Sequence, residues 1–275
     1  MSLQFASINS GSNGNCYYVG NSQDAVLIDA GISCREIEKR MTRIGLSLQN
    51  VRAVFISHEH SDHIRGLPTL LKKYRLPLYI TAPTFCGTGM YLYEELMRDF
   101  SNEETVTIGS LTIKPFSKIH DAADPYSFTV TAGGTTVGVF TDLGRPCSNL
   151  VQHFGQCHAA ILESNYDEEL LQNGGYPWHL KQRIRGGKGH LSNSEALELF
   201  RAQRSPQLTH LVLGHLSQNN NDPKLVEDLF APHAGTVQIT VASRFAESVL
   251  FEVNGGSSTV TPVYASARPA QLQLF

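Results

Sequence analysis

The chain has 275 residues, of which 41% are hydrophobic and 17% are charged, and its formal net charge is −3. This composition supports a sizeable core and excludes global disorder. It also excludes a uniformly basic surface, so any surface that binds nucleic acid must be a local one.

Neither a secretory signal nor a membrane helix is expected. The first residues lack a basic segment followed by an apolar run, and no stretch approaches the roughly 20 apolar residues of a membrane helix. The five cysteines are scattered and form no C-x-x-C pair, which is typical of reduced thiols. We therefore expect a cytoplasmic protein with no membrane partner.

Strands and helices alternate in the first third of the chain. Residues 3–9, 16–20 and 25–29 have the composition of strands. Ser33 and Glu36 form a capping-box pattern, which predicts that a helix begins there. A buried strand is expected over residues 51–57, and helical sequence follows around residues 64–74.

The second half begins with strands and then alternates again. Strand sequences continue to residue 141, another strand is expected at 159–164, and a further one at 210–214. Helices are expected after Ser194 and from Pro223, with Asp222 as the cap. Strands between two sets of helices predict an α/β protein, a four-layer αββα sandwich. Residues 1–253 are predicted to form this domain, and 254–275 a flexible tether rich in Gly, Ser, Pro and Ala.

The sequence HEHSDH directly follows the strand at 51–57. In an extended segment His58 and His60 point to the same side. Asp62 and His63 follow where the chain bends into a helix, so they face a neighbouring point. Such nitrogen and oxygen ligands suit Zn²⁺, Mn²⁺ or Fe. A single histidine here would be explained as an exposed polar residue at the start of a helix, but the spacing of these four residues would not.

The cluster resembles that of the metallo-β-lactamase superfamily. The resemblance implies the metallo-β-lactamase fold and a two-metal site completed by a later histidine, an aspartate and a last histidine. His120, Asp142 and His215 match these positions, and each follows an apolar strand. The implied site has one metal on His58, His60 and His120, a second on Asp62, His63 and His215, and Asp142 as the bridge.

Two metals about 3.5–4 Å apart can hold a hydroxide at neutral pH and clamp both sides of an in-line displacement. This arrangement suits phosphodiester hydrolysis, although it also serves lactams and thioesters. Asp62 could in addition orient the hydroxide or take its proton.

A narrower resemblance is to a bacterial subgroup, the WalJ/YycJ-type exonucleases. It rests on residues 162–193, on SGSNGNCYYV near the N-terminus, and on HDAADP and GHLSQNNN. It implies a 5′→3′ DNA exonuclease active in DNA repair, with mismatch repair as one role. The alternatives are an RNA-processing nuclease of the same fold, a lactamase- or thioesterase-type hydrolase, and a non-catalytic adaptor bound to a sliding clamp.

A local basic strip supports a nucleic-acid substrate. The segment between Glu169 and Glu195 contains no acidic residue. Its basic residues suit phosphate contacts, although a solvated helix face would explain any single one. These residues are Lys181, Arg183, Arg185 and Lys188.

A helix start follows this strip. Ser192 and Glu195 form a capping-box pattern, and helix N-termini favour phosphate oxygens. Ser192 and Asn193 are therefore candidates for substrate binding. Asn219, which follows the last histidine of the metal site, is a further candidate, or it caps the next helix.

His190 lies between the predicted bridging aspartate and the last metal histidine. The related tRNA 3′-processing enzymes carry a proton-donating histidine in that interval, so the resemblance implies that His190 protonates or stabilises the leaving oxygen. Glu163 would orient His190, and a structural hydrogen bond is an equal alternative. Asp62, His190 and Glu163 are thus the candidate catalytic residues.

The last five residues, QLQLF, resemble the short peptide by which bacterial repair proteins dock on the β sliding clamp. Leu272, Leu274 and Phe275 would fill an apolar groove, and Gln271 would bond at its edge. The alternative is a final strand with Leu272 and Leu274 facing the core.

Overall fold

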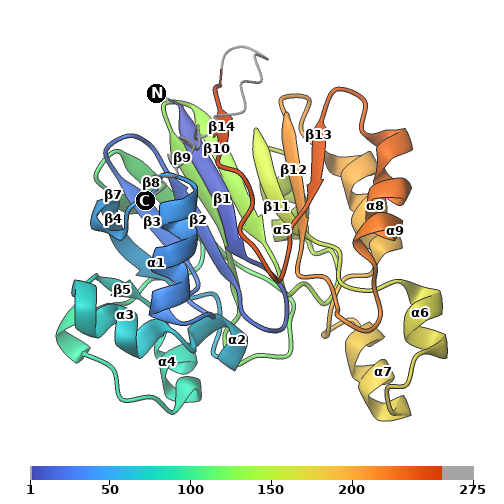
Figure 1. The fold of residues 1–275 in the computed structure, drawn as a ribbon, viewed down its shortest axis with the longest axis horizontal. Helices are drawn as coiled ribbons and strands as arrows, with labels where there is room; N and C mark the ends of the chain where they lie inside the picture. The colour runs from blue at the N-terminus through green and yellow to red at the C-terminus, as the bar shows by residue number, and fades with distance from the viewer. Residues whose placement is uncertain (1, 256–275) are drawn as a thin grey trace, which may run out of the picture.

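A computed structural model describes residues 2–255. These residues form two seven-stranded sheets that pack face to face (Figure 1). The first sheet has the order β14 (Phe251–Val253), β1 (Leu3–Asn9), β2 (Cys16–Gly20), β3 (Ala25–Ile28), β4 (Val51–Phe55), β5 (Leu78–Tyr79) and β6 (Met97–Arg98). The second has the order β13 (Gln238–Val241), β12 (His210–Gly214), β11 (Ala159–Glu163), β10 (Thr135–Phe140), β9 (Tyr126–Ala132), β8 (Leu111–Ser117) and β7 (Val106–Ile108).

The largest aromatic side chains fill the space between the sheets. Phe5, Tyr17 and Phe55 come from the first sheet, and Phe128 comes from the second. All four are fully buried. Burying one such side chain stabilises a fold by about 1.5–3 kcal/mol, so this layer fixes how the two sheets face each other.

Helices cover the outer face of each sheet (Figure 1), which confirms the predicted αββα sandwich. The first sheet is covered by α1 (Cys34–Arg43), α2 (Ser61–Ile64), α3 (Leu67–Tyr74) and α4 (Ala82–Thr88). The second sheet is covered by α5 (Ser148–Phe154), α8 (Asn193–Gln203) and α9 (Pro223–Phe230). Short 3₁₀ turns are η1 (Leu48–Asn50), η2 (Glu94–Leu96) and η3 (Ala231–His233).

The predicted helix starts are present. The Ser33 side chain accepts a hydrogen bond from Glu36 N at the start of α1. Ser192 and Glu195 form a reciprocal capping box on α8. Asp222 caps α9 by accepting from Lys224 N. Each cap satisfies a backbone donor that the helix itself leaves free.

Both sheets contain a block of parallel strands. β3 to β6 are parallel neighbours in the first sheet, and β10 to β13 in the second. The carboxyl ends of parallel strands meet at one edge of a sheet, which is where open α/β sheets bind ligands. The loops after β4, β10, β11 and β12 therefore gather at this edge.

Two helices, α6 (Glu168–Asn173) and α7 (Trp178–Arg185), project away from the second sheet as an arm (Figure 1). The arm has a small core of its own, made by Tyr166, Leu171 and Ile184. The four basic residues predicted to contact phosphate lie on α7 or directly after it.

Within residues 2–255, no helix combines the length and the apolar character that crossing a membrane requires. The strand β14 ends at Val253. The predicted tether and the predicted clamp-binding residues Gln271, Leu272, Leu274 and Phe275 lie outside the described residues, so they stay predictions.

Candidate metal centre

The predicted metal ligands lie together at the carboxyl edge of the sheets. His58 and His60 follow β4, His120 follows β8, Asp142 follows β10 and His215 follows β12. Asp62 and His63 belong to α2, the short helix that continues from the same loop as His60. The structure thus brings all seven predicted ligands together, from both sheets.

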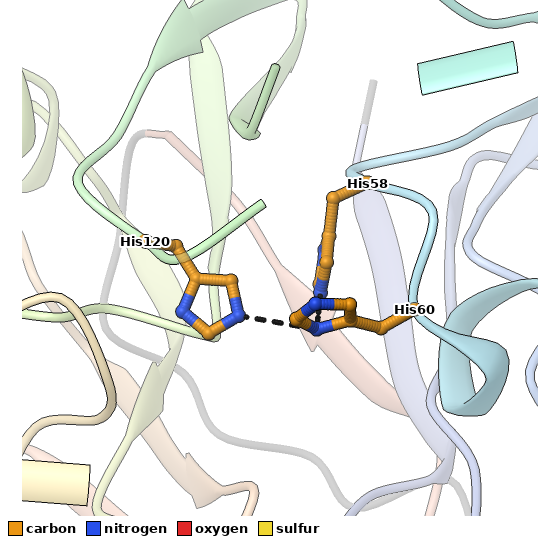
Figure 2. Close-up of side chains that lie close together, drawn as sticks. All are labelled: His58, His60 and His120. Atoms are coloured by element: carbon orange, nitrogen blue, oxygen red, sulfur yellow. Dashed lines mark hydrogen bonds between the residues drawn. The ribbon is translucent and has the colours of Figure 1, made fainter. Parts of the chain in front are cut away.

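Three histidines form the first cluster (Figure 2). His60 Nδ1 lies 3.0 Å from His58 Nε2 and 3.4 Å from His120 Nε2. The far ring nitrogens of His58 and His120 have partners: His58 Nδ1 lies 2.9 Å from Ser57 Oγ, and His120 Nδ1 donates to Gly189 O at 2.8 Å. Fixing Nδ1 in this way leaves the Nε2 lone pair free to face the cluster.

Asp62, His63 and His215 form the second cluster. Asp62 Oδ2 lies 3.5 Å from His63 Nε2 and 3.6 Å from His215 Nε2. His63 Nδ1 donates to Asp29 Oδ2 at 2.7 Å, and His215 Nδ1 donates to Glu163 Oε1 at 3.0 Å. Carboxylates on the far ring nitrogen orient both imidazoles, as is common for histidines that bind metals.

Asp142 lies between the two clusters. Its Oδ2 is 3.1 Å from His63 Nε2, and its Oδ1 is 3.8 Å from His120 Nε2. Asp142 Oδ2 is buried, and the polar group closest to it is the ring nitrogen Nε2 of His63, which carries a proton only while no metal is bound. When that proton is displaced, the buried carboxylate oxygen needs another positive partner, so this atom is placed to bind a cation that both clusters can reach.

The charges of the buried groups also fit cations. Four carboxylates face the centre, and in the absence of metal the buried Lys118 ammonium, which donates to Thr141 O at 2.7 Å, and protons on His63 and His215 offset only part of their charge. Unbalanced buried charge is strongly unfavourable. The imidazole and carboxylate donors therefore fit divalent metal ions of the zinc or manganese type. The four carboxylates are Asp29, Asp62, Asp142 and Glu163.

The pKa values of the histidines divide them into two groups. Burial lowers the pKa of His58 well below its ordinary value and that of His120 to about 4, so both are neutral. Burial also lowers the pKa of His63 and His215, but Asp142 and the other carboxylates outweigh it. They raise the pKa of His63 well above its ordinary value and that of His215 to about 10. Without metal, these two histidines carry protons that a metal must displace.

Three site residues have positive φ angles although none is a glycine. The angles are 64° at Asp29, 55° at Asp142 and 56° at His215. Asp29 directly follows β3, His215 directly follows β12, and Asp142 lies two residues after β10. Left-handed backbone costs a non-glycine residue about 1–3 kcal/mol. The rest of the fold must therefore stabilise strained backbone at the strand ends that carry these site residues.

His190 and Glu163 form the predicted pair. His190 Nδ1 donates to Glu163 Oε1 at 2.8 Å, the same oxygen that accepts from His215. Glu163 is fully buried, and its Oε2 accepts from Leu143 N at 2.5 Å and Leu191 N at 3.2 Å. Four donors thus converge on one carboxylate. This carboxylate orients the His190 ring, which borders the cavity above the metal centre.

This cavity has a volume of about 390 Å³. His60, Asp62, Asp142, His190 and His215 line one side of it. The arm also lines it, through Tyr176, Leu180, Arg183 and Ile184. The arm therefore forms a wall of the metal cleft.

Of the basic strip, Arg183 lines the cleft, where it pairs with Asp121 beside His120. Lys181 Nζ donates to Gln172 O, and Arg185 donates to the side chain of the same glutamine on α6. Lys188 is exposed. Arg183 is thus the member of the strip that is placed to meet a substrate at the metal centre.

Of the other residues predicted to contact the substrate, one lies at the cleft and two are buried. Asn219 is exposed and donates to Tyr176 Oη at 3.2 Å, at the rim of the cleft. Ser192 and Asn193 are 2% exposed. Ser192 caps α8, and Asn193 Oδ1 accepts from Ser164 Oγ at 2.7 Å. We correct the expectation for these two residues, because their polar atoms are used inside the protein.

Some residues of the centre had no role in the sequence-based prediction. Asn15 Nδ2 lies 3.1 Å from Asp62 Oδ2 and 3.0 Å from His63 Nε2. Asp29 orients the His63 ring, and the Lys118 ammonium offsets part of the negative charge of the carboxylates. Asp29 gave a signal, since it ends an apolar strand as the ligands do, whereas Asn15 and Lys118 match no spacing rule.

Comparison with known proteins agrees with this geometry. The model of the β-lactamase superfamily domain matches residues 24–215. Exodeoxyribonuclease YycJ of Bacillus anthracis is 33% identical over 82% of this chain and 86% of its own length. Exodeoxyribonuclease WalJ of Streptococcus pneumoniae is 31% identical over 81% of this chain and 85% of its own length.

Solved structures share the fold. The metallo-β-lactamase fold protein YhfI from Bacillus subtilis superposes with a TM-score of 0.71 at 17% identity, covering 92% of this chain and 100% of that chain. The fold, the matched domain and the two relatives together identify the family of this chain. The chain belongs to the β-lactamase superfamily, with the metallo-β-lactamase fold, and within it to the family of the exodeoxyribonucleases YycJ and WalJ.

Proposed function

We propose that the protein is a two-metal phosphodiesterase that removes nucleotides from DNA in the 5′→3′ direction. The observation that carries the proposal is the buried Asp142 carboxylate, which lies between two clusters of metal-ligating atoms, 3.1 Å from His63 Nε2 and 3.8 Å from His120 Nε2. DNA is favoured over RNA because the relatives that match four fifths of the chain are named exodeoxyribonucleases.

The proposal assigns His58, His60 and His120 to one ion, and Asp62, His63 and His215 to the other, with Asp142 shared. Two divalent ions, Zn²⁺, Mn²⁺ or Fe, also balance the four carboxylates of the centre. Bound there, they would activate a water and stabilise charge on the attacking and leaving oxygens of a phosphodiester.

Side chains of the cleft supply the proton transfers. Asp62 lines the cleft, where its carboxylate orients the attacking water and accepts its proton. His190 Nδ1 is occupied by Glu163, so its Nε2 is the atom that delivers a proton to the leaving oxygen. General acid–base catalysis of this kind contributes about 10²–10⁴-fold to a rate.

The arm provides the contacts with the substrate. Arg183 is 58% exposed and Asp121 25% exposed, and an exposed ion pair contributes about 0–1 kcal/mol. A phosphate can therefore take the place of Asp121 at little cost, and a charge-assisted bond to it is roughly twice as strong as a neutral one. Lys181, Arg185, Lys188 and Asn219 extend this surface along the arm.

The proposal extends to the cellular setting. It places the protein in the cytoplasm, in DNA repair that includes mismatch repair. Residues 254–275 act as a tether that docks on the β sliding clamp and raises the local concentration of enzyme. Deleting Leu274 and Phe275 should abolish clamp binding while DNA cleavage by the free enzyme is unchanged, and unchanged clamp binding would refute this part.

The direct test is an end-labelled cleavage assay on single- and double-stranded DNA and RNA, with Mn²⁺, Zn²⁺ and Mg²⁺ in turn. Stepwise loss of 5′ nucleotides from DNA is expected. Preferential cleavage of RNA would favour the RNA-processing alternative. Hydrolysis of a lactam or thioester with every polynucleotide left intact would favour the small-molecule alternative, and no hydrolysis by metal-loaded protein would favour the adaptor.

A further inference from the structure

A second cavity, of about 540 Å³, lies next to the metal cleft. It lies within the range of about 300–1,000 Å³ that is typical of small-ligand pockets. Ser217 lines both cavities. Ser10 lines the second one, and its Oγ accepts from the backbone N of the metal ligand His215 at 2.8 Å. The second cavity is therefore a direct neighbour of the metal centre.

One wall of this cavity is the segment between β13 and β14, which crosses from one sheet to the other (Figure 1). The segment has no regular secondary structure, yet side chains hold its backbone in place. Arg244 O accepts from Asn13 Nδ2 at 2.9 Å, and Phe245 O accepts from Arg40 at 3.2 Å. Arg40 is itself buried and donates to Ile8 O at 3.1 Å, within β1.

The next residues of the segment are held as firmly. Glu247 receives two hydrogen bonds from the Arg43 guanidinium, at 2.7 and 2.5 Å. Ser248 N donates to Ser7 O at 2.8 Å, and Ser7 N donates to Ser248 Oγ at 3.0 Å. Despite this fixed backbone, Phe245 is 76% exposed. The protein thus holds the backbone of an exposed aromatic residue in a defined position at the edge of the cavity.

The chemistry of the lining selects between possible ligands. Leu216 and Val241 give it an apolar part beside Phe245. The carboxylates that line it are Asp222 and Glu227, and they repel phosphate. The Arg244 guanidinium offsets only one of these two charges, and its donors are directed at Leu216 O and the Gln218 side chain. An aromatic ligand with N–H donors fits this lining, and a nucleobase has both features.

We infer that this cavity binds one unstacked nucleobase of the DNA strand whose phosphate lies at the metal centre, with Phe245 as the stacking platform. The inference rests on the proposed function, since the base belongs to the nuclease substrate. Its carboxylates accept from amino groups on the base edge, as Asp and Glu do with cytosine. Stacking on an aromatic side chain tolerates any base, while the carboxylates favour a base with an amino group, so the site should accept adenine, cytosine and guanine more readily than thymine.

The test combines kinetics with a fluorescent base. Losing one base–aromatic stack is expected to raise KM for DNA by roughly 5- to 150-fold in Phe245→Ala, while kcat and metal content stay near the wild-type values. Phe245→Trp should restore KM because it keeps an aromatic face. Tyr91→Ala is the matched control, because Tyr91 is a fully exposed aromatic residue that borders a different groove, beside α3.

Placing 2-aminopurine at each position in turn from the 5′ end locates the base. Stacking quenches this fluorophore, so one position should be quenched in DNA bound to Zn²⁺-loaded His190→Ala protein. Adding Phe245→Ala should remove that quenching, and adding Phe245→Trp should keep it. An abasic site at the same position should raise KM of the wild-type enzyme but not that of Phe245→Ala.

The outcomes separate the two proposals. If the wild-type enzyme cleaves no DNA, the proposed function fails and the nucleobase site fails with it. If it cleaves DNA but Phe245→Ala keeps its KM and no position is quenched, only the nucleobase site is refuted. A change of sedimentation in Phe245→Ala would also refute it, because the ring would then be a contact between copies of the chain.

Discussion

Replacing Glu163 by glutamine should disable the metal centre without removing a metal ligand. The carboxylate accepts four hydrogen bonds, two of them from the Nδ1 atoms of His190 and His215. A glutamine offers one acceptor oxygen, and its amide nitrogen would face donors. Two buried donors lose their acceptor at about 1–3 kcal/mol each, so stability should fall by about 2–6 kcal/mol unless the rings adapt.

The rings can adapt only by changing tautomer. Metal binding requires a neutral His215; if the new amide donates to its Nδ1, the one remaining ring proton lies on Nε2, the atom that faces Asp62 in the second cluster. That atom can then no longer bind a metal. Loss of such an orienting partner typically costs 10–100-fold in metal affinity or activity, so we expect about that loss for the second ion.

Two measurements check this prediction on the same protein preparation. A metal titration gives the affinity for each equivalent, and single-turnover cleavage of 5′-labelled DNA gives the rate of the chemical step. Glu195→Gln is the matched control, because Glu195 belongs to the capping box of α8 and the change is chemically identical. Wild-type affinity for the second ion together with a wild-type cleavage rate in Glu163→Gln would refute the role assigned to this carboxylate.

Three further predictions follow from the same geometry. Because the metal-free protein holds protons on His63 and His215, binding of metal at pH 7 should release these protons, and the affinity for metal should fall as pH is lowered. Calorimetry in buffers of different ionisation enthalpy measures the release. Metal binding without proton release would contradict the raised pKa values. Arg183→Ala should reduce the slope of log affinity against log salt by about 0.7–0.9, while Asp121→Asn should tighten DNA binding by up to about fivefold; an unchanged slope would remove Arg183 from the path of the substrate. His190→Ala should slow single-turnover cleavage by about 10²–10⁴-fold with metal content unchanged, and lost metal would instead make it structural.

The candidate metal ligands could be predicted from the spacing of the histidine cluster and from a family resemblance, and each of them lies in a loop or helix that follows a strand. Strand ends are visible in a sequence as the point where an apolar run meets a polar residue, and the carboxyl ends of parallel strands meet in space. His120 and Asp142 come from one sheet and His58 from the other; the resemblance to the superfamily selected them, and the strand ends explain why they meet.

The side chains that support the ligands could not be predicted in this way. Lys118 lies in the segment between the end of β8 and His120, and its importance follows from the carboxylates that other segments bring near it. Asn193 was instead predicted to contact the substrate, although it is buried. The capping pattern correctly predicted where α8 begins, but it does not tell whether the side chains at that start face the cleft or the interior.

The central claim is that two ions act together on one phosphate. Mn²⁺ can be titrated into metal-free protein while bound metal and cleavage of 5′-labelled DNA are followed in the same samples. We predict two bound ions per chain, with cleavage that appears only as the second ion binds, and neither in Asp142→Ala. Full cleavage at one equivalent, or a chain that never binds a second ion, would contradict the account.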